Sequence, residues 1–178
     1  MTQQGGGQAN VGRGMIWAAF IGALALLTWL SQGYLDQRIN PNQSPQSSVS
    51  GGVAEVELKR NRSGHYFVTG FINGQEVDFL LDTGATNVAV PGDLAERLGL
   101  VALATHTVST ANGNVTAYAT TLDTVQVGDI RQHAVSASIT PTMGGDEVLL
   151  GMSFLKDLEL IQRGNTLTLR QLNTGFSQ

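Results

Sequence analysis

The sequence contains no cysteine and only 4 prolines among its 178 residues. The absence of cysteine excludes disulfide bonds and zinc sites built from thiolates. Charged residues make up only 13% of the chain, the formal net charge is -4, and no stretch gathers lysine or arginine. Proteins that bind nucleic acid need a basic stripe, so this composition argues against a nucleic-acid partner. A His-Glu-x-x-His motif is also missing, and we expect neither a metal nor another cofactor.

Glycine is frequent, with 22 residues, which suits tight turns and β-structure. One long apolar run without a charge lies near the N-terminus, at residues 15–30. Extended to residue 35, this run is long enough for a membrane-spanning helix, and aromatic side chains lie near its ends. We therefore predict a single-pass transmembrane anchor at residues 15–35. The polar segment before it is rich in glycine and glutamine, and we predict a disordered N-terminal tail at residues 1–14.

Two other interpretations of the apolar run remain open. It could be a cleaved signal peptide, although it is not followed by a clear small-x-small cleavage site. It could also be a buried core helix, although it has no amphipathic period. Arg13 before the run favours a cytoplasmic N-terminus, which would place the rest of the chain outside the inner membrane, in the periplasm of a Gram-negative cell. The polar segment at residues 36–52 predicts a flexible linker.

Residues 53–178 alternate between apolar and polar side chains with a period of two, which predicts β-strands. Short helical patterns follow Pro91 and Gly151. The expected fold is all-β, a small closed barrel with one or two short helices. Three pairs of strands are joined by residues typical of hairpin turns. These turns are Asn73-Gly74, Gly128-Asp129 and Gly164-Asn165.

The stretch FLLDTGAT, residues 79–86, carries an aspartate from an apolar strand into a turn. An ionised carboxylate that is dry and unpaired costs several kcal/mol, so Asp82 needs a reason to be there. Asp and Gly are common in turns, and LDTV at residues 122–125 repeats Leu-Asp-Thr without the glycine, so three residues alone are a weak motif. A second apolar strand in EVLLGMSFL ends at Gly151 and adds weight to the first motif.

Together, LLDTGAT and the downstream LLGMSFL resemble the retropepsin-like aspartic proteases, and in particular a membrane-anchored bacterial group with one protease domain. The resemblance covers residues 53–172 and implies a retropepsin-type barrel with a flap over the substrate. It implies a catalytic loop in which Thr83 braces the site and Gly84 lets the substrate backbone approach Asp82. The substrate-binding residues that it implies are Ala85, Thr86, Ala111, Asn112 and Gly113, the last three at the flap tip.

The chemistry of peptide hydrolysis explains why such a site uses acids. One carboxylate must be ionised to activate a water, and a second must be protonated to donate to the carbonyl oxygen, so the pair shares a proton. The chain has one Asp-Thr-Gly motif, so the second carboxylate has to come from another copy. The sequence thus predicts a homodimer with one site on its two-fold axis and a polypeptide substrate.

Several features permit other interpretations. The segment around Asn112-Gly113 could be an ordinary hairpin, and the loop at residues 140–147 could line the substrate groove or simply be a surface loop. A catalytically inactive dimerisation or binding module tethered to the membrane is the alternative function, and a structural envelope protein is a third. The histidines are isolated in the sequence, and we expect them to be structural or exposed: His65, His106 and His133.

Overall fold

The computed structural model describes residues 8–110 and 113–172. The chain divides into two units, a helical one that ends at Arg38 and a β-rich one that begins at Ile39. Two of the residues predicted to form a flap tip, Ala111 and Asn112, lie outside the described residues.

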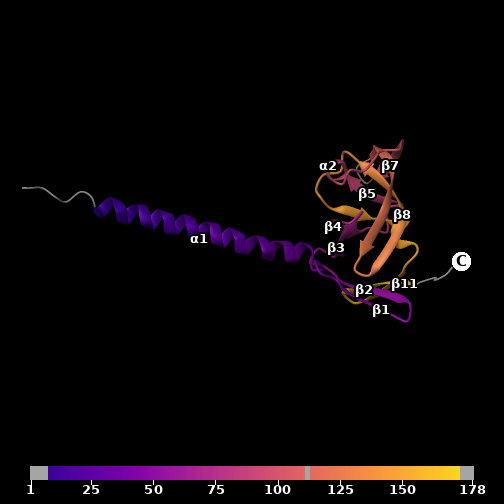
Figure 1. The fold of residues 1–178 in the computed structure, drawn as a ribbon, viewed down its shortest axis with the longest axis horizontal. Helices are drawn as coiled ribbons and strands as arrows, with labels where there is room; N and C mark the ends of the chain where they lie inside the picture. Colours follow the sequence, from indigo (N-terminus) through magenta and orange to yellow (C-terminus); the bar gives the residue numbers. More distant parts are fainter. Residues whose placement is uncertain (1–7, 111–112, 173–178) are drawn as a thin grey trace, which may run out of the picture. The chain divides into compact units, whose positions relative to one another are not determined.

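The helical unit is formed by α1 (Gln8–Ile39), a helix of 32 residues (Figure 1). It includes residues 8–14, which the sequence analysis assigned to a disordered tail. Extending an existing helix costs less than nucleating one, so the apolar segment carries helical structure into its polar flanks. The helix ends before Asn40-Pro41, because the residue preceding a proline is disfavoured in the α-conformation.

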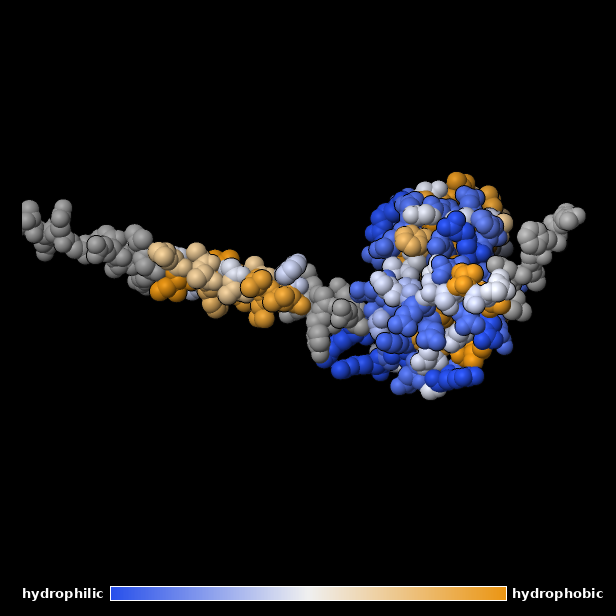
Figure 2. Space-filling model, turned by 60° about the horizontal axis from the view of Figure 1, so that its bottom comes forward, coloured by the Kyte–Doolittle hydropathy of each residue, from blue (hydrophilic) through white to orange (hydrophobic). Residues whose placement is uncertain are grey.

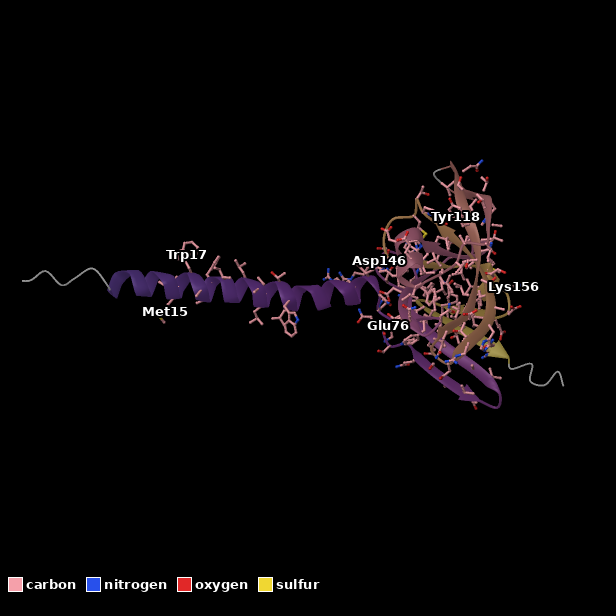
Figure 3. All side chains as sticks on the ribbon, turned by 45° about the horizontal axis from the view of Figure 1, so that its top comes forward. Met15, Trp17, Glu76, Tyr118, Asp146 and Lys156 are labelled. Carbon is pink, nitrogen blue, oxygen red and sulfur yellow. The ribbon has the colours of Figure 1, made fainter. Side chains whose placement is uncertain are left out.

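Large apolar side chains are exposed along α1 and appear as an apolar surface in Figure 2. Met15 and Trp17 project from different sides of the helix (Figure 3). Among the described residues, no helix is both long enough and apolar enough to cross a membrane. The anchor predicted at residues 15–35 stays a prediction. The exposed large apolar residues of this segment are Met15, Ile16, Trp17, Phe20, Ile21, Leu24, Leu26, Leu27, Trp29 and Leu30.

The β-rich unit contains two sheets within the described residues. In the smaller sheet the strand order is β1-β2-β11-β10, and in the larger it is β3-β4-β9-β5-β8-β7-β6. The strands are β1 (Gln46–Ser50), β2 (Val53–Lys59), β3 (Phe67–Ile72), β4 (Gln75–Leu81), β5 (Val88–Pro91), β6 (Ala104–Thr110), β7 (Gly113–Val127), β8 (Ile130–Thr140), β9 (Val148–Leu150), β10 (Glu159–Arg163) and β11 (Thr166–Leu172).

The larger sheet closes on itself, because β3 pairs with β7 as well as with β4. β6 extends this ring by pairing with β7 alone, and β7 and β8 run side by side as its longest strands (Figure 1). Two pairs in the ring are parallel, β4 with β9 and β5 with β8. The short helices α2 (Gly92–Arg97) and α3 (Met152–Leu155) lie in the expected places. The prediction of a mostly β fold with few helices is confirmed.

The predicted hairpins are present, and apolar alternation explains their burial. The turn between β3 and β4 has positive φ at both Asn73 (50°) and Gly74 (80°), the conformation that Asn-Gly favours in two-residue hairpins. Along β2 the buried residues are Ala54, Val56 and Leu58, with more exposed side chains between them. This alternation directs one face of each strand into a continuous apolar core.

The segment predicted to be a flexible linker, residues 36–52, is ordered instead. Asn42 is only 4% exposed, and its side chain donates to the carbonyl oxygens of Lys59 (2.9 Å) and Phe67 (2.6 Å) and accepts from the amide of Lys59 (2.7 Å). Asn40 is 3% exposed and donates to Asp78 Oδ1 at 2.8 Å. Hydrogen bonds of two carboxamides, rather than apolar burial, hold this segment, so its polar composition was misleading.

The same segment then forms β1, which pairs antiparallel with β2 along its whole length. The turn between them contains Gly51 and Gly52, both with positive φ. Every residue of β1 is exposed, so the strand leaves no apolar period in the sequence. The β-rich unit consequently begins at Ile39 rather than at residue 53.

Candidate active site

Asp82 lies at the end of a strand, where two parallel strands finish together. Leu81 ends β4 and is paired with Leu150, which ends β9. The Asp82 amide donates to the Leu150 carbonyl oxygen at 3.2 Å and extends the ladder by one hydrogen bond. Gly151 follows Leu150, so parallel pairing brings the two sequence motifs to the same edge of the sheet.

The Asp82 carboxylate is held by the backbone of its own turn. Its Oδ1 accepts a hydrogen bond from the Gly84 amide at 2.9 Å, and the Asp82 carbonyl accepts one from the Ala85 amide at 3.2 Å. The side chain is partly exposed, and Thr83 and Gly84 are exposed. Among the described residues, no cationic side chain forms a salt bridge with Asp82. Its remaining acceptor positions are therefore available to a water or to another carboxyl group.

Backbone amides of the second motif hold the residues that follow this turn. The Met152 amide donates to the Ala85 carbonyl oxygen at 2.8 Å, and the Ser153 amide donates to the Thr86 carbonyl oxygen at 2.9 Å. Both donors belong to the first turn of α3, whose amides have no partner inside the helix. The helix start therefore fixes the backbone beyond Gly84.

The Ser153 side chain adds a further link. Its hydroxyl donates to the Ser136 carbonyl oxygen of β8 at 2.7 Å and accepts from the Val88 amide of β5 at 3.0 Å. Val88 is fully buried, so this bond satisfies a donor that water cannot reach. The Ser153 side chain therefore links β5 to β8.

Gly151 is required by a close approach of two backbones. A Cβ atom at this position would lie 2.2 Å from the Asn87 carbonyl oxygen and 2.7 Å from that of Ala85. Both distances are far below a normal contact, so any larger residue would displace the loop. The glycine of the second motif thus allows α3 to lie directly beneath the loop that carries Asp82.

Asp82 opens into a cleft of about 990 Å³. One wall is formed by the loop from Asp82 to Asn87, of which every residue except Thr83 lines the cleft, and residues of the β6–β7 ribbon form another. The lining also includes Thr140, Thr142, Met143 and Gly144, from the loop that the sequence left open as a groove lining or a surface loop. A second cavity of about 380 Å³ is lined by Arg97 and four acidic residues, among others, but by no residue of the Asp-Thr-Gly loop. We assign the candidate site to the larger cleft.

The structure brings together some of the predicted site residues but not all. The cleft is lined by Asp82, Gly84, Ala85 and Thr86. Thr83 and Gly113 are described, but they do not line it. The ribbon contributes through residues further from its turn, including His106, Val108 and Val115.

His106, which was expected to be structural or exposed, is partly buried and lines the cleft. A signal for its position was present in the sequence. Counting outward from the Asn112-Gly113 turn places residue 106 opposite residue 117 and on the same face as residue 108, since alternate residues share a face.

Among the described residues, no group of three His, Cys, Asp or Glu side chains could hold a metal ion.

A family model described as "gag-polyprotein putative aspartyl protease" matches residues 68–157, about half of the chain. An uncharacterized protein encoded in the cobV 5′ region of Sinorhizobium sp. is 35% identical over 73% of this chain and 58% of its own length. An uncharacterized protein of Rickettsia prowazekii (strain Madrid E) is 29% identical over 69% of this chain and 54% of its own. The chain thus spans little more than half the length of these curated relatives.

A solved structure is similar in fold as well as in sequence. The crystal structure of a retropepsin-like aspartic protease from Rickettsia conorii superposes with a TM-score of 0.59 and 28% identity, covering 72% of this chain and 96% of that one. The family model spans both the Asp-Thr-Gly loop and the Gly151 motif beneath it. The chain therefore belongs to the retropepsin-like aspartic protease family.

Proposed function

We propose that this protein is an aspartic endopeptidase whose active site contains two Asp82 carboxylates, one from each protomer of a homodimer. The observation that carries the proposal is the position of Asp82. It stands at the end of β4, open to a cleft, with its carboxylate hydrogen-bonded to the Gly84 amide and paired with no cation among the described residues.

The proposed chemistry follows from two carboxyl groups at hydrogen-bond distance. Such a pair holds one proton, because two like charges in contact cannot both ionise. The ionised carboxylate takes a proton from a water molecule, whose oxygen attacks the peptide carbonyl carbon. The protonated carboxyl group donates to the carbonyl oxygen and so stabilises the tetrahedral intermediate. The carboxyl group that took the proton from the water then donates it to the amide nitrogen, and the amine is released as the C–N bond breaks.

The homodimer is proposed because each chain supplies half of the catalytic pair. The sequence contains one Asp-Thr-Gly motif, and Thr83 and Gly84 at the tip of its turn are exposed in the single chain. A two-fold axis beside this tip would place one Asp82 next to the other. Thr83 would then brace the paired loops, as expected from its place in the motif.

The substrate in this proposal is an extended polypeptide segment lying in the cleft. Gly84 lets the substrate backbone approach, and Ala85 and Thr86 form the wall beside the catalytic acid, which their position in the cleft supports. The roles of Ala111, Asn112 and Gly113 at a flap tip remain predictions.

Proteolysis of a peptide library by the purified full chain tests the function. Wild type should cleave, and Asp82→Asn should not, while both unfold at the same urea concentration. Asp123→Asn is a matched control, because Asp123 is an exposed aspartate in the incomplete Leu-Asp-Thr sequence of β7, and this variant should retain activity. Equal cleavage by wild type and Asp82→Asn would refute the assignment, and a wild type that binds peptides without cleaving them would favour an inactive binding module.

The localisation also remains a prediction. The charge-free apolar segment at residues 15–30 is the reason to expect membrane association, with the β-rich unit outside the inner membrane. Fractionation of cells expressing the full chain, together with a reporter fused after Gln178, tests both points. Recovery of the full-length chain entirely from the soluble fraction would contradict an anchor.

A further inference from the structure

The wall of the candidate cleft contains a histidine that the proposed chemistry does not use. Asp82 and His106 are the two titratable side chains among the residues that line it, and the remaining lining residues are small, hydroxylic, amide or apolar. His106 lies on β6 and is partly buried. A polar group at such a position in an otherwise uncharged wall is suited to selecting what binds there.

The strand register places this side chain on the same face of the β6–β7 ribbon as other residues that line the cleft. His106 is paired with Ala117, and Val108 with Val115, across the β6–β7 ribbon. Directly paired residues and alternate residues along a strand share a face of the sheet. His106 therefore lies on the same face as Val108 and Val115, two apolar residues that line the cleft with it.

Ser138 of β8, which also lines the cleft, is hydrogen-bonded to the imidazole. Its hydroxyl oxygen lies 3.1 Å from His106 Nε2, and Ser138 is only 4% exposed. Ser138 is paired with Ala119, which stands on the same face of β7 as Ala117, so the serine and the histidine meet across three strands. A buried hydroxyl bonded to one ring nitrogen restricts the ring orientation and leaves the other nitrogen, Nδ1, for a ligand.

The hydrogen-bonding capacity of this arrangement indicates which ligand fits. When the Ser138 hydroxyl donates to Nε2, the neutral ring carries its proton on Nδ1, and when the ring is protonated, both nitrogens donate. In both of these states Nδ1–H offers a donor to a substrate group, whereas the neutral form protonated on Nε2 offers Nδ1 as an acceptor. A carboxylate is the acceptor that gains most, because its hydrogen bond to a ring N–H is charge-assisted and stronger than one to a neutral acceptor.

Resting on the function proposed above, we propose that His106 is a specificity-determining residue that binds an acidic side chain of the polypeptide substrate. Val108 and Val115 contact the apolar part of that side chain, and His106 binds its carboxylate. Ser138 is a positioning residue, which acts by holding the ring. A lysine or arginine at the same substrate position finds no carboxylate among these four residues.

The test compares peptides that differ only in charge. Matched peptides with Glu, Gln or Lys at each position around the cleavage site are cleaved by the full-length wild type and by His106→Gln. Wild type should prefer Glu over Gln at one position by about tenfold in kcat/KM, and His106→Gln should reduce this ratio to about one. Ser138→Ala should lower the ratio partially. His133→Gln is the control, since His133 is an exposed histidine of β8 that does not line the cleft, and it should keep the wild-type ratio.

A ratio is decisive because a merely structural loss would lower cleavage of all peptides alike. The inference is overturned if wild type shows no preference for Glu at any position, or if His106→Gln keeps that preference. Binding of the same peptides to Asp82→Asn and to the Asp82→Asn, His106→Gln double variant gives a readout that needs no catalysis. Glu-selective binding that disappears with His106, in a protein that cleaves nothing, would uphold this inference while refuting the proposed function.

Discussion

Replacing Gly151 with alanine should damage the candidate site without touching any residue assigned to chemistry. The added Cβ would lie 2.2 Å from the Asn87 carbonyl oxygen and 2.7 Å from that of Ala85. Because non-bonded carbon atoms in proteins pack at about 3.5 Å or more, the loop must retreat from α3 by about 1 Å. This movement also weakens the hydrogen bonds from the Met152 and Ser153 amides, at 2.8 and 2.9 Å.

Two effects of different size should follow from Gly151→Ala. Overpacking of this kind lowers the free energy of unfolding by about 1–3 kcal/mol. A displacement of about 1 Å in a positioned catalytic group lowers the rate by about 100-fold. Urea unfolding and kcat/KM for a cleaved peptide measure the two effects separately. Gly144→Ala is the stability control, because a Cβ there meets nothing within 4 Å. A Gly151→Ala variant equal to wild type in both measurements would show that the close approach does not hold the catalytic loop.

Three further substitutions test the β-rich unit by urea unfolding. Asn42→Ala should lower the free energy of unfolding by about 2–4 kcal/mol, because it leaves three backbone groups without their partner, and a neutral result would mean that residues 40–52 are a loose tether after all. Tyr66→Phe should raise the free energy of unfolding by up to about 1 kcal/mol, because the buried Tyr66 hydroxyl has no hydrogen-bond partner among the described residues. A clear decrease in the free energy of unfolding would show that the hydroxyl has such a partner. Arg170→Ala should lower the urea midpoint at low salt and less at high salt, since Arg170 bonds Glu55 (2.6 Å) and Glu159 (3.0 Å), and a salt-independent change would exclude a charge effect.

The local elements of the fold could be predicted because they are encoded locally. Period-two alternation and the Asn73-Gly74 turn identified the β3–β4 hairpin, and Gly151 marked the start of α3. β1 could not be predicted, because every one of its side chains is exposed and it is stabilised by pairing with β2. The order around Asn42 was equally hidden, since a polar carboxamide shows nothing of its partners until the chain is folded.

The candidate site could likewise be predicted from the sequence only in part. The sequence placed Asp82 at the end of an apolar strand and Gly151 after another, and the structure brings both to one edge through parallel pairing of β4 and β9. That pairing joins segments far apart in the chain, so only the resemblance to a family could suggest it. The position of His106 in the cleft was not predicted, because its orientation depends on the strand register. Counting from the Asn112-Gly113 turn would have placed it on the same face of the ribbon as Val108.

Mixing of protomers tests most directly the central claim that two Asp82 carboxylates from different chains form one active site. Wild type and Asp82→Asn are combined at a constant total concentration, allowed to exchange, and assayed with one peptide, with Asp123→Asn replacing Asp82→Asn as the control. If mixed dimers are inactive, activity falls as the square of the wild-type fraction, to about one quarter at equal amounts. The Asp123→Asn mixture should keep full activity. A linear fall with Asp82→Asn, to about one half at equal amounts, would show that each chain works alone and would contradict the account.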